Sequence, residues 1–484
     1  MTQAAERWQT RALRRPAGVA RFIEIYRDAG LLPLTPAESR LLADLERCLG
    51  CGNCLAVCPV LGALAPTPYP GPRAVGTGLS RCLPEYRAAS ELVGYCTTCM
   101  ACEEVCPADV PVFRAVLMVR AKCFEQLAVE GREPLPRLKL LLVDFFSQGR
   151  LGQLARWGSA LQKLAYRRTS TGEMQARLPL ALGALGSRLL PPLAARPLTA
   201  EFPGAVSGLD PDGPRVAVFA GCLDNYAYTD TGRALVEVLR RHSREVVVPA
   251  GQVCCGAPAY YAGDLPTAWR LAVENARVFA ETGADFVVTA CASCGDVLTR
   301  EYPVLARSLP ESQNLPERGG TTEGSGDISR TVPDLVASLA ARARDVHAFL
   351  GGEVSFRPPR ARPEPGGPLR VTLHDPCHLA RGQGLAGEVR RLVTGLPGVE
   401  VEEMRDPGAC CGGAGSYALD HHDVAVAIRR PKIEAIAATG AGVVVTGCPS
   451  CRLHIADGLA AAGLARPVRH FVELAQAAYA AERA

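Results

Sequence analysis

The pattern of hydrophobic and polar positions over residues 1–130 is helical, with few strand-like runs. The stretch TPAE at residues 35–38 is a capping box with proline at the first helical position, which predicts a helix that runs toward Cys48. A second helix is predicted over residues 112–130, directly after a proline. We therefore expect this part of the chain to be a small helical domain with cysteine-rich loops.

The pattern changes after residue 130. Residues 131–210 contain amphipathic helical pieces, such as RLGQLARWGSALQKLAYR, which Pro191 and Pro192 interrupt, and they predict a helical connector. From Arg215 onward, short β-branched runs alternate with helical patterns, which is typical of parallel βαβ units. The predicted fold class is therefore multidomain α+β, with the helical domain first and α/β units after it.

Cysteines mark an internal repeat in the α/β part. One unit has Cys222, Cys254-Cys255-Gly256 and Cys291-x-x-Cys294, and the other has Cys377, Cys410-Cys411-Gly412 and Cys448-x-x-Cys451. The spacings are 32 and 36 residues in one unit against 33 and 37 in the other. We name them the first and second CCG units, over residues 211–308 and 367–484. Between them we expect a disordered insertion at 309–331, which is polar and glycine-rich, and a connecting helix and loop at 332–366.

Each cysteine group follows a predicted strand, as in RVAVFAGC and GVVVTGCPSC. The carboxyl ends of parallel strands meet at one edge of a sheet, so the repeat is expected to gather five thiolates at such an edge, twice. Adjacent cysteines rarely bridge each other, because a disulfide needs Cα atoms about 4.4–6.8 Å apart. Adjacent thiolates can instead each ligate a different metal ion of one bound group, and the glycine lets the backbone approach that group without a Cβ clash. The alternative is a tight turn with inert thiols.

Composition and charge indicate the cellular compartment and the classes of binding partner to expect. The chain has 53 Lys and Arg against 49 Asp and Glu, which gives no argument for binding nucleic acid or an anionic membrane. The N-terminus lacks an apolar signal-peptide core, and the best apolar run, residues 138–146, is about half the ~18 residues that span a bilayer. We expect a cytoplasmic protein, with peripheral contact to the inner face of the cytoplasmic membrane through a partner. Disulfides are rare in that compartment, so 20 cysteines indicate metal.

Two runs in the helical domain, CLGCGNCLAVCP at 48–59 and CTTCMACEEVCP at 96–107, match the ferredoxin pattern for [4Fe–4S] clusters. In that pattern three close thiolates hold one cluster and the fourth cysteine reaches the other. The ligands assigned are Cys48, Cys51, Cys54 and Cys106 for one cluster, and Cys96, Cys99, Cys102 and Cys58 for the second. Structural zinc is the alternative, but it uses C-x-x-C pairs rather than a triple with a cysteine-proline. The separation of 38 positions between Cys58 and Cys96 favours a helical ferredoxin type.

Other candidate side chains carry less information. Three histidines lie within four residues of a CCG cysteine, namely His374, His378 and His454. They either donate hydrogen bonds to sulfur or carry protons, or they are solvated loop residues. Four further residues are predicted to have no special role: Cys82 and Cys123 as buried thiols, and His421 and His422 as surface residues. No catalytic residue is assigned.

These motifs carry a family resemblance over nearly the whole chain. The paired CCG units resemble those of heterodisulfide reductase catalytic subunits and of the iron–sulfur subunits of glycolate and lactate oxidases. PGPR at 70–73 and the segment that begins CCGGAGSYALDHH at Cys410 are most similar to the glycolate oxidase subunit. That subunit often lacks the first cysteine of each C-x-x-C, whereas Cys291 and Cys448 are present here. Complete units resemble the heterodisulfide reductase type, in which such a unit holds a noncubane [4Fe–4S] cluster.

The resemblance implies an electron-transfer subunit of a glycolate- or D-lactate-type dehydrogenase complex. It implies two ferredoxin-type [4Fe–4S] clusters and one or two further clusters in the CCG units. An FAD-containing 2-hydroxy-acid dehydrogenase subunit would supply electrons, and a quinone or another carrier would accept them. The chain has no G-x-G-x-x-G after a strand and no G-x-x-x-x-G-K-[ST], which fits a flavin held by another subunit. The alternatives are disulfide reduction at the CCG clusters, as in heterodisulfide reductases, and a zinc-binding scaffold.

Overall fold

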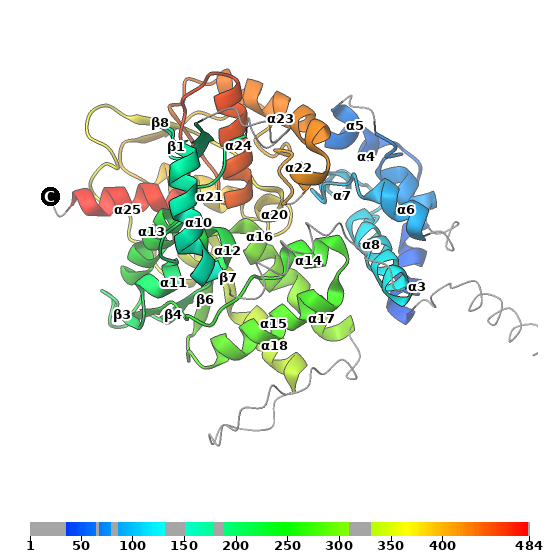
Figure 1. The fold of residues 1–484 in the computed structure, drawn as a ribbon, viewed down its shortest axis with the longest axis horizontal. Coiled ribbons are helices and arrows are strands. Elements are labelled where there is room, and N and C mark those ends of the chain that lie inside the picture. The colour runs from blue at the N-terminus through cyan, green and yellow to red at the C-terminus, as the bar shows by residue number, and fades with distance from the viewer. Residues whose placement is uncertain are drawn as a thin grey trace, which may run out of the picture.

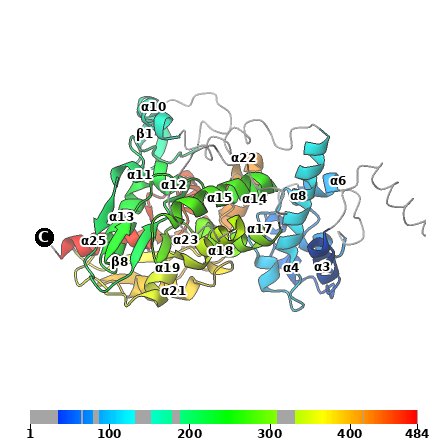
Figure 2. The ribbon, with the colours of Figure 1, turned by 90° about the horizontal axis from the view of Figure 1, so that it is seen from below.

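The computed structural model describes residues 35–63, 67–78, 86–130, 151–177, 188–308, 331–415 and 417–482. A helical N-terminal domain lies on one side of two α/β units, in both views (Figures 1 and 2). Its helix α8 contacts α14 of the first unit, and its helix α5 contacts α23 of the second. The helical domain therefore lies against both units.

The described residues of the N-terminal domain form helices and loops, without a strand. Its elements are α3 (Pro36–Leu45), α4 (Asn53–Ala56), α5 (Pro59–Gly62), a π-helical turn (Ala74–Gly78), α6 (Tyr86–Val93), α7 (Ala101–Glu104) and α8 (Val112–Val129). The capping box at α3 is complete, because the Glu38 amide donates to Thr35 Oγ1 at 3.2 Å and the Thr35 amide donates to Glu38 Oε2 at 2.6 Å. Both helices predicted from the sequence here are confirmed.

The segment predicted as a helical connector is only partly helical. Helix α10 (Leu151–Ala165) is present, but it is followed by an antiparallel hairpin of β1 (Tyr166–Arg168) and β2 (Met174–Ala176). A short helix, α11 (Leu198–Glu201), leads to β3 (Ala205–Ser207), which pairs antiparallel with the first unit's sheet. Strands of three residues are too short to produce a clear alternation in the sequence, and pairing with a distant strand stabilises them.

The first CCG unit has a sheet ordered β3-β5-β4-β6-β7, parallel except for β3. Its strands are β4 (Arg215–Val218), β5 (Glu245–Val247), β6 (Phe286–Thr289) and β7 (Ala343–Asp345). Its helices are α12 (Gly221–Tyr226), α13 (Thr229–Arg240), α14 (Ala257–Ala262), α15 (Leu265–Ala280), α16 (Ala292–Asp296), α17 (Tyr302–Ser308), α18 (Val332–Arg342) and α19 (Val346–Ala348), with π-helical turns at Val297–Glu301 and Phe349–Glu353.

The second unit repeats this order. Its sheet, β9-β8-β10-β11, is parallel throughout and matches β5-β4-β6-β7 strand for strand. Its strands are β8 (Leu369–Leu373), β9 (Val399–Val401), β10 (Val443–Val445) and β11 (Val468–Arg469). Its helices are α20 (Cys377–Ala380), α21 (Ala386–Thr394), α22 (Tyr417–Asp420), α23 (His422–Ala437), α24 (Pro449–Ala461) and α25 (Phe471–Ala481). The predicted parallel βαβ repeat is confirmed.

The match shows that the segment at 332–366, predicted as a connecting helix and loop, supplies part of the first unit. Its strand β7 pairs with β6 at the edge of the first sheet. The sequence hides this relation because a long segment separates β7 from the rest of its unit. The predicted insertion at 309–331 lies outside the described residues, except for Thr331, which caps α18.

The two units share a core. Valines of β4 and β8, such as Val216 and Val371, belong to one buried cluster together with Phe471 of α25. Helix α25 packs on α13 of the first unit, and Glu473 of α25 forms an ion pair with Arg452 of α24. The chain's last helix therefore holds the two sheets together.

Across the described ranges, no helix combines the length and the apolar character needed to cross a membrane. The apolar run at 138–146 lies outside those ranges.

Candidate iron–sulfur sites

The cysteines that follow the strands lie at the carboxyl ends of the two sheets. Cys222, Cys254 and Cys291 come after β4, β5 and β6, and the second unit repeats this placement. Cys291 and Cys448 are the N-cap residues of α16 and α24, so each C-x-x-C motif spans the start of a helix. The sheet topology therefore brings the thiols of each unit to one edge.

The first ferredoxin site lies near the surface. Cys48, Cys51, Cys54 and Cys106 line one small pocket, which Cys102 also borders, and Cys51 is exposed. Burial raises the pKa of the Cys54 thiol, and the nearby Cys48, Cys106 and Cys51 raise it further. The fourth cysteine of the second run thus lies with the first three of the other run.

The second ferredoxin site is deeper. Burial raises the pKa of the Cys58 thiol to about 11, with added repulsion from Cys96 and Cys99. Burial likewise raises the pKa of Cys102, and Cys96, Cys99 and Cys58 contribute to the shift. Cys58, the fourth cysteine of the first run, therefore lies beside the first three cysteines of the second run. The two sites thus exchange their fourth cysteines.

A single cavity of about 780 Å³ contains the thiols of both CCG units. Its cysteine lining is Cys96, Cys123, Cys222, Cys254, Cys255, Cys291, Cys294, Cys377, Cys410, Cys411, Cys448 and Cys451. The sequence predicted two separate gatherings of five thiols. The tertiary structure joins the two, because the carboxyl edges of both sheets face the same space.

Thiol contacts run through this cavity. In the first unit Cys294 Sγ lies 3.4 Å from Cys255 Sγ, and Cys222 hydrogen-bonds to Cys254. Across the units Cys291 hydrogen-bonds to Cys448, and the Ala292 amide donates to the Gly447 carbonyl at 2.9 Å. The two cysteine sets are therefore in direct contact.

In the second unit Cys411 hydrogen-bonds to Cys451. Its sulfur, that of Cys451 and a ring nitrogen of His374 lie within 4.8 Å of one another. Thiol and imidazole at this spacing are a set that a soft metal could bind.

The second unit also touches the helical domain. The Cys410 thiol donates to the Cys99 sulfur, which lowers the pKa of Cys99 to about 6 and raises that of Cys410. Cys410 Sγ also lies 3.9 Å from Thr97 Oγ1. The second ferredoxin site and the second CCG site are thus adjacent.

The chemistry of these side chains fits iron–sulfur clusters. All the cysteines within the described ranges are free thiols, including those that contact one another. Hydrogen bonds with neighbouring thiols, and then burial, raise the pKa of several well above the usual range, among them Cys222 and Cys294. Crowded sulfurs of this kind become stable thiolates when metal ions supply the positive charge.

The glycine of each CCG tripeptide lies where the backbone turns close to the following helix. Gly256 and Gly412 both have left-handed backbones, with φ of 86° and 79°. A Cβ on Gly412 would lie 2.4 Å from the Ala425 carbonyl oxygen of α23, and one on Gly256 would lie 3.4 Å from the Ala268 backbone of α15. The glycines therefore allow the turn and its close packing on the following helix.

The three histidines near the CCG cysteines are buried, so the alternative of solvated loop residues is wrong. His374 faces Cys411, His378 hydrogen-bonds to Cys377, and His454 Nε2 lies 3.4 Å from the Ala425 carbonyl. His374 follows β8, whereas His378 and His454 lie in α20 and α24, and all three line the cavity shared by the two units.

His421 and His422, predicted as surface residues, are half-buried, so that prediction is confirmed only in part. The His421 ring lies 4.2 Å from that of Tyr95, and His422 contacts Arg188. Cys123 is buried as predicted and lines the cavity, whereas Cys82 lies outside the described residues.

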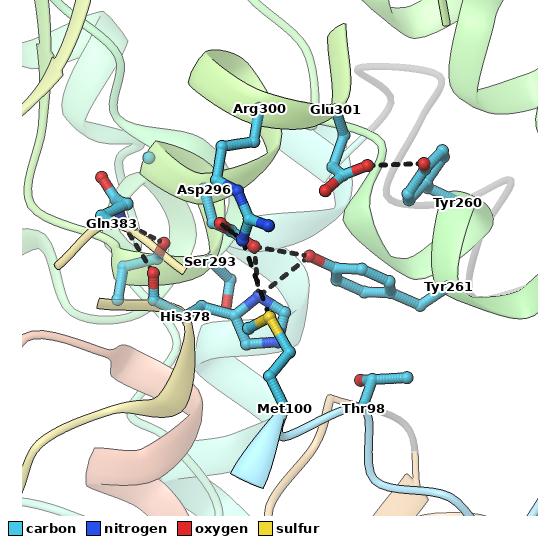
Figure 3. A network of polar contacts seen from close by, with 12 residues as sticks. Thr98, Met100, Tyr260, Tyr261, Ser293, Asp296, Arg300, Glu301, His378 and Gln383 are labelled. Carbon is cyan, nitrogen blue, oxygen red and sulfur yellow. Dashed lines mark hydrogen bonds and ion pairs between the residues drawn. The ribbon is translucent and has the colours of Figure 1, made fainter. Parts of the chain in front are cut away.

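A polar network not predicted from the sequence surrounds His378 (Figure 3). His378 Nδ1 lies 2.7 Å from Asp296 Oδ2 and 2.9 Å from the Tyr261 hydroxyl. Arg300 pairs with Asp296 at 3.0 Å and reaches Met100 Sδ of the helical domain at 3.6 Å. The network connects all three parts of the chain, and no local pattern marks its members, because they come from separate segments.

Comparison with known proteins agrees with these sites. The 4Fe-4S dicluster domain matches residues 44–110, and the Cysteine-rich domain (CCG) matches residues 216–299 and 371–456. The chain is 29% identical to one subunit of the Fumarate reductase (CoM/CoB) of Methanothermobacter marburgensis, over 93% of this chain and 76% of that protein. It is 27% identical to a Probable glycolate oxidase iron-sulfur subunit of Bacillus subtilis, over 89% and 93%. It is 29% identical to Lactate utilization protein A of Geobacillus thermodenitrificans, over 54% and 98%.

Proposed function

We propose that this iron–sulfur protein, which contains a 4Fe-4S dicluster domain and two CCG domains, carries electrons from a flavoprotein partner to a quinone or another carrier. The flavoprotein would oxidise a 2-hydroxy acid such as glycolate or D-lactate. The relatives named as a glycolate oxidase iron-sulfur subunit and a lactate utilization protein support this class of substrate. An acceptor at a membrane would be reached through a partner.

One observation carries the proposal: the thiols form a continuous series from the surface to the cavity. Iron–sulfur clusters, when bound, accept and release single electrons. Cys51 at the first site is exposed, and Leu49 beside it is 73% exposed. The contact of Cys99 with Cys410 then joins the helical domain to the second CCG unit. We assign the crossed ferredoxin ligands and the ten CCG cysteines to cluster binding on this basis.

Flavin dependence tests the proposal. The anaerobically purified, flavin-free chain should not oxidise glycolate or D-lactate with an artificial acceptor. Addition of a 2-hydroxy-acid dehydrogenase flavoprotein that co-purifies with it should bleach the iron–sulfur absorbance when substrate is added. Cys99→Ser should interrupt this bleaching at the CCG units. Turnover by the flavin-free chain would refute the proposal.

A second candidate is disulfide reduction in the cavity. The volume of about 780 Å³ between the two cysteine sets supports it, as do the complete C-x-x-C motifs at Cys291 and Cys448. The reaction would take up two electrons and two protons, break one S–S bond and release two thiols. The electrons would come from the donor that supplies the ferredoxin sites.

Thiol release distinguishes the two candidates. Reduced viologen would supply electrons to the loaded chain in the presence of cystine or hydroxyethyl disulfide, and the thiols would be counted. Two thiols for each disulfide, lost in Cys411→Ser, would favour the reductase. Viologen oxidation by a quinone analogue without thiol formation would favour electron transfer alone.

A further inference from the structure

The two CCG loops are held from equivalent helix positions by different side chains. In the first unit Asn275 stands five residues before Ala280, the last residue of α15. In the second unit Lys432 stands five residues before Ala437, the last residue of α23. Both side chains are buried, and both reach the loop that carries the adjacent cysteines. The repeat thus places a neutral amide beneath one loop and an amine beneath the other.

Asn275 holds its loop without charge. Its Oδ1 accepts from the Val253 amide at 3.0 Å, and its Nδ2 donates to the Cys254 carbonyl at 3.0 Å. The Tyr302 hydroxyl donates to the Cys255 carbonyl at 3.1 Å. The first loop is therefore fixed entirely by neutral groups.

Lys432 holds the second loop through its amine. Nζ donates to the backbone carbonyls of Asp406 and Pro407 at 2.7 and 2.9 Å, and it lies 3.7 Å from Met404 Sδ. The side chain is 1% exposed. Burying an ammonium group costs free energy unless neighbouring groups stabilise the charge. The asparagine at the equivalent position of the first unit avoids this cost.

The surroundings keep Lys432 cationic at neutral pH. Burial lowers its pKa to about 8, while Asp406, Cys411, Asp375 and Cys410 oppose that shift. Asp375 is already paired with Arg390 through two contacts of 3.0 Å. The charge of Lys432 therefore interacts most strongly with Asp406 and next with the second unit's Cys411.

Neighbouring positions of the repeat reinforce the contrast. The residue three positions before the first cysteine is Phe219 in the first unit and His374 in the second. The residue three positions after the last cysteine is Val297 in the first unit and His454 in the second. All four are buried. The second site thus has polar, hydrogen-bonding neighbours where the first has apolar ones.

We propose that Lys432 makes the second CCG site easier to reduce than the first. An electron that enters the CCG units is then held mainly at the second site, which adjoins Cys99. Adding an electron makes a site more negative, and a buried cation nearby stabilises that state. With clusters bound, one electron would leave the Cys96 site and enter the second-unit site, with no bond made and no proton moved. This inference rests on the proposed cluster binding by both CCG units.

Potentiometric titration of the anaerobic, cluster-loaded protein tests the inference. The signals would be assigned by their loss in Cys255→Ser for the first unit and Cys411→Ser for the second. In the wild-type protein the second-unit signal should appear first on stepwise reduction. This test needs no change at Lys432.

Variants of Lys432 isolate the charge. Lys432→Met should lower the midpoint potential of the second unit by about 59 mV, which is a tenfold change in a one-electron equilibrium. The midpoint potential of the first unit should not change. Lys432→Arg keeps the charge and should retain most of the wild-type value. Reduction of the first unit before the second, or an unshifted midpoint in a fully loaded Lys432→Met protein, would overturn the inference alone. A wild-type protein without iron in the CCG units would overturn the cluster assignment as well.

Discussion

Single residues at the CCG turns determine how closely each loop approaches its helix. Gly412 combines a left-handed backbone with a position where a Cβ would meet the Ala425 carbonyl oxygen at 2.4 Å. Gly415 has a similar backbone, with φ of 62°, but open space around it. The two glycines therefore separate the cost of backbone strain from the cost of a clash.

We predict that Gly412→Ala is much more destabilising than Gly415→Ala. A left-handed alanine costs roughly 1–2 kcal/mol at either position, and forced packing adds about 1–3 kcal/mol at Gly412 only. Thermal unfolding of the loaded protein should show a larger fall in midpoint for Gly412→Ala, together with loss of iron. Equal shifts in the two variants would mean that the second CCG loop moves away from Ala425 at little cost in free energy.

Individual cysteines of the ferredoxin runs are expected to serve the opposite cluster. Cys106→Ser should perturb the cluster of Cys48, Cys51 and Cys54 and spare that of Cys96, because Cys106 lies in the pocket of the first run. EPR of the reduced protein checks this, with Cys58→Ser as the matched variant for the other cluster. Loss of the Cys96 signal in Cys106→Ser would contradict the crossed assignment.

At the scale of elements, the junction of the helical domain with the first unit depends on a buried carboxylate. Glu301, in the π-helical turn before α17, is fully buried and pairs with Arg114 of α8. The Tyr260 hydroxyl of α14 donates to Glu301 at 2.5 Å, and Arg114 also donates to that hydroxyl at 3.1 Å. Three elements therefore meet at one charge pair.

We predict that Arg114→Met destabilises this junction by about 3 kcal/mol, because it leaves the Glu301 carboxylate buried without its partner. Glu301→Gln in the same chain should restore most of the loss, since the buried charge is then gone. Thermal unfolding and protease sensitivity between the helical domain and the first unit provide the measurements. Simple addition of the two single effects in the double variant would show that the pair is not coupled.

At the scale of the whole molecule, the number of irons distinguishes full from partial loading. Two ferredoxin clusters and two CCG clusters would give about 16 irons, against about 8 if the CCG units are empty. We expect full loading, because both units present five cysteines to one cavity. Cys411→Ser should lose about four irons and keep the ferredoxin signals. An unchanged iron content in that variant would exclude the Cys-Cys pair as ligands.

Much of the architecture could be predicted because its signals are local. The capping box at Thr35 and each ferredoxin run depend on residues close together in the chain, and the CCG cysteines recur at nearly the same spacing in both units. Strand and helix patterns then place the cysteines at the carboxyl ends of parallel strands, since topology alone sends those ends to one edge. The prediction failed for β1, β2, β3 and β7, whose three-residue strands exist only through pairing with other segments.

The sequence by itself determined which residues could bind metal and that they form two similar units. Only the tertiary structure decided that the two units face one cavity, that Cys410 meets Cys99, and that Lys432 lies beneath one loop where Asn275 lies beneath the other. The reason is physical: these contacts join residues far apart in the chain, and their geometry is set by the packing of α25 on α13 and of the helical domain on both units. A spacing pattern describes ligands along the chain, whereas burial and charge around them arise only when the elements pack together.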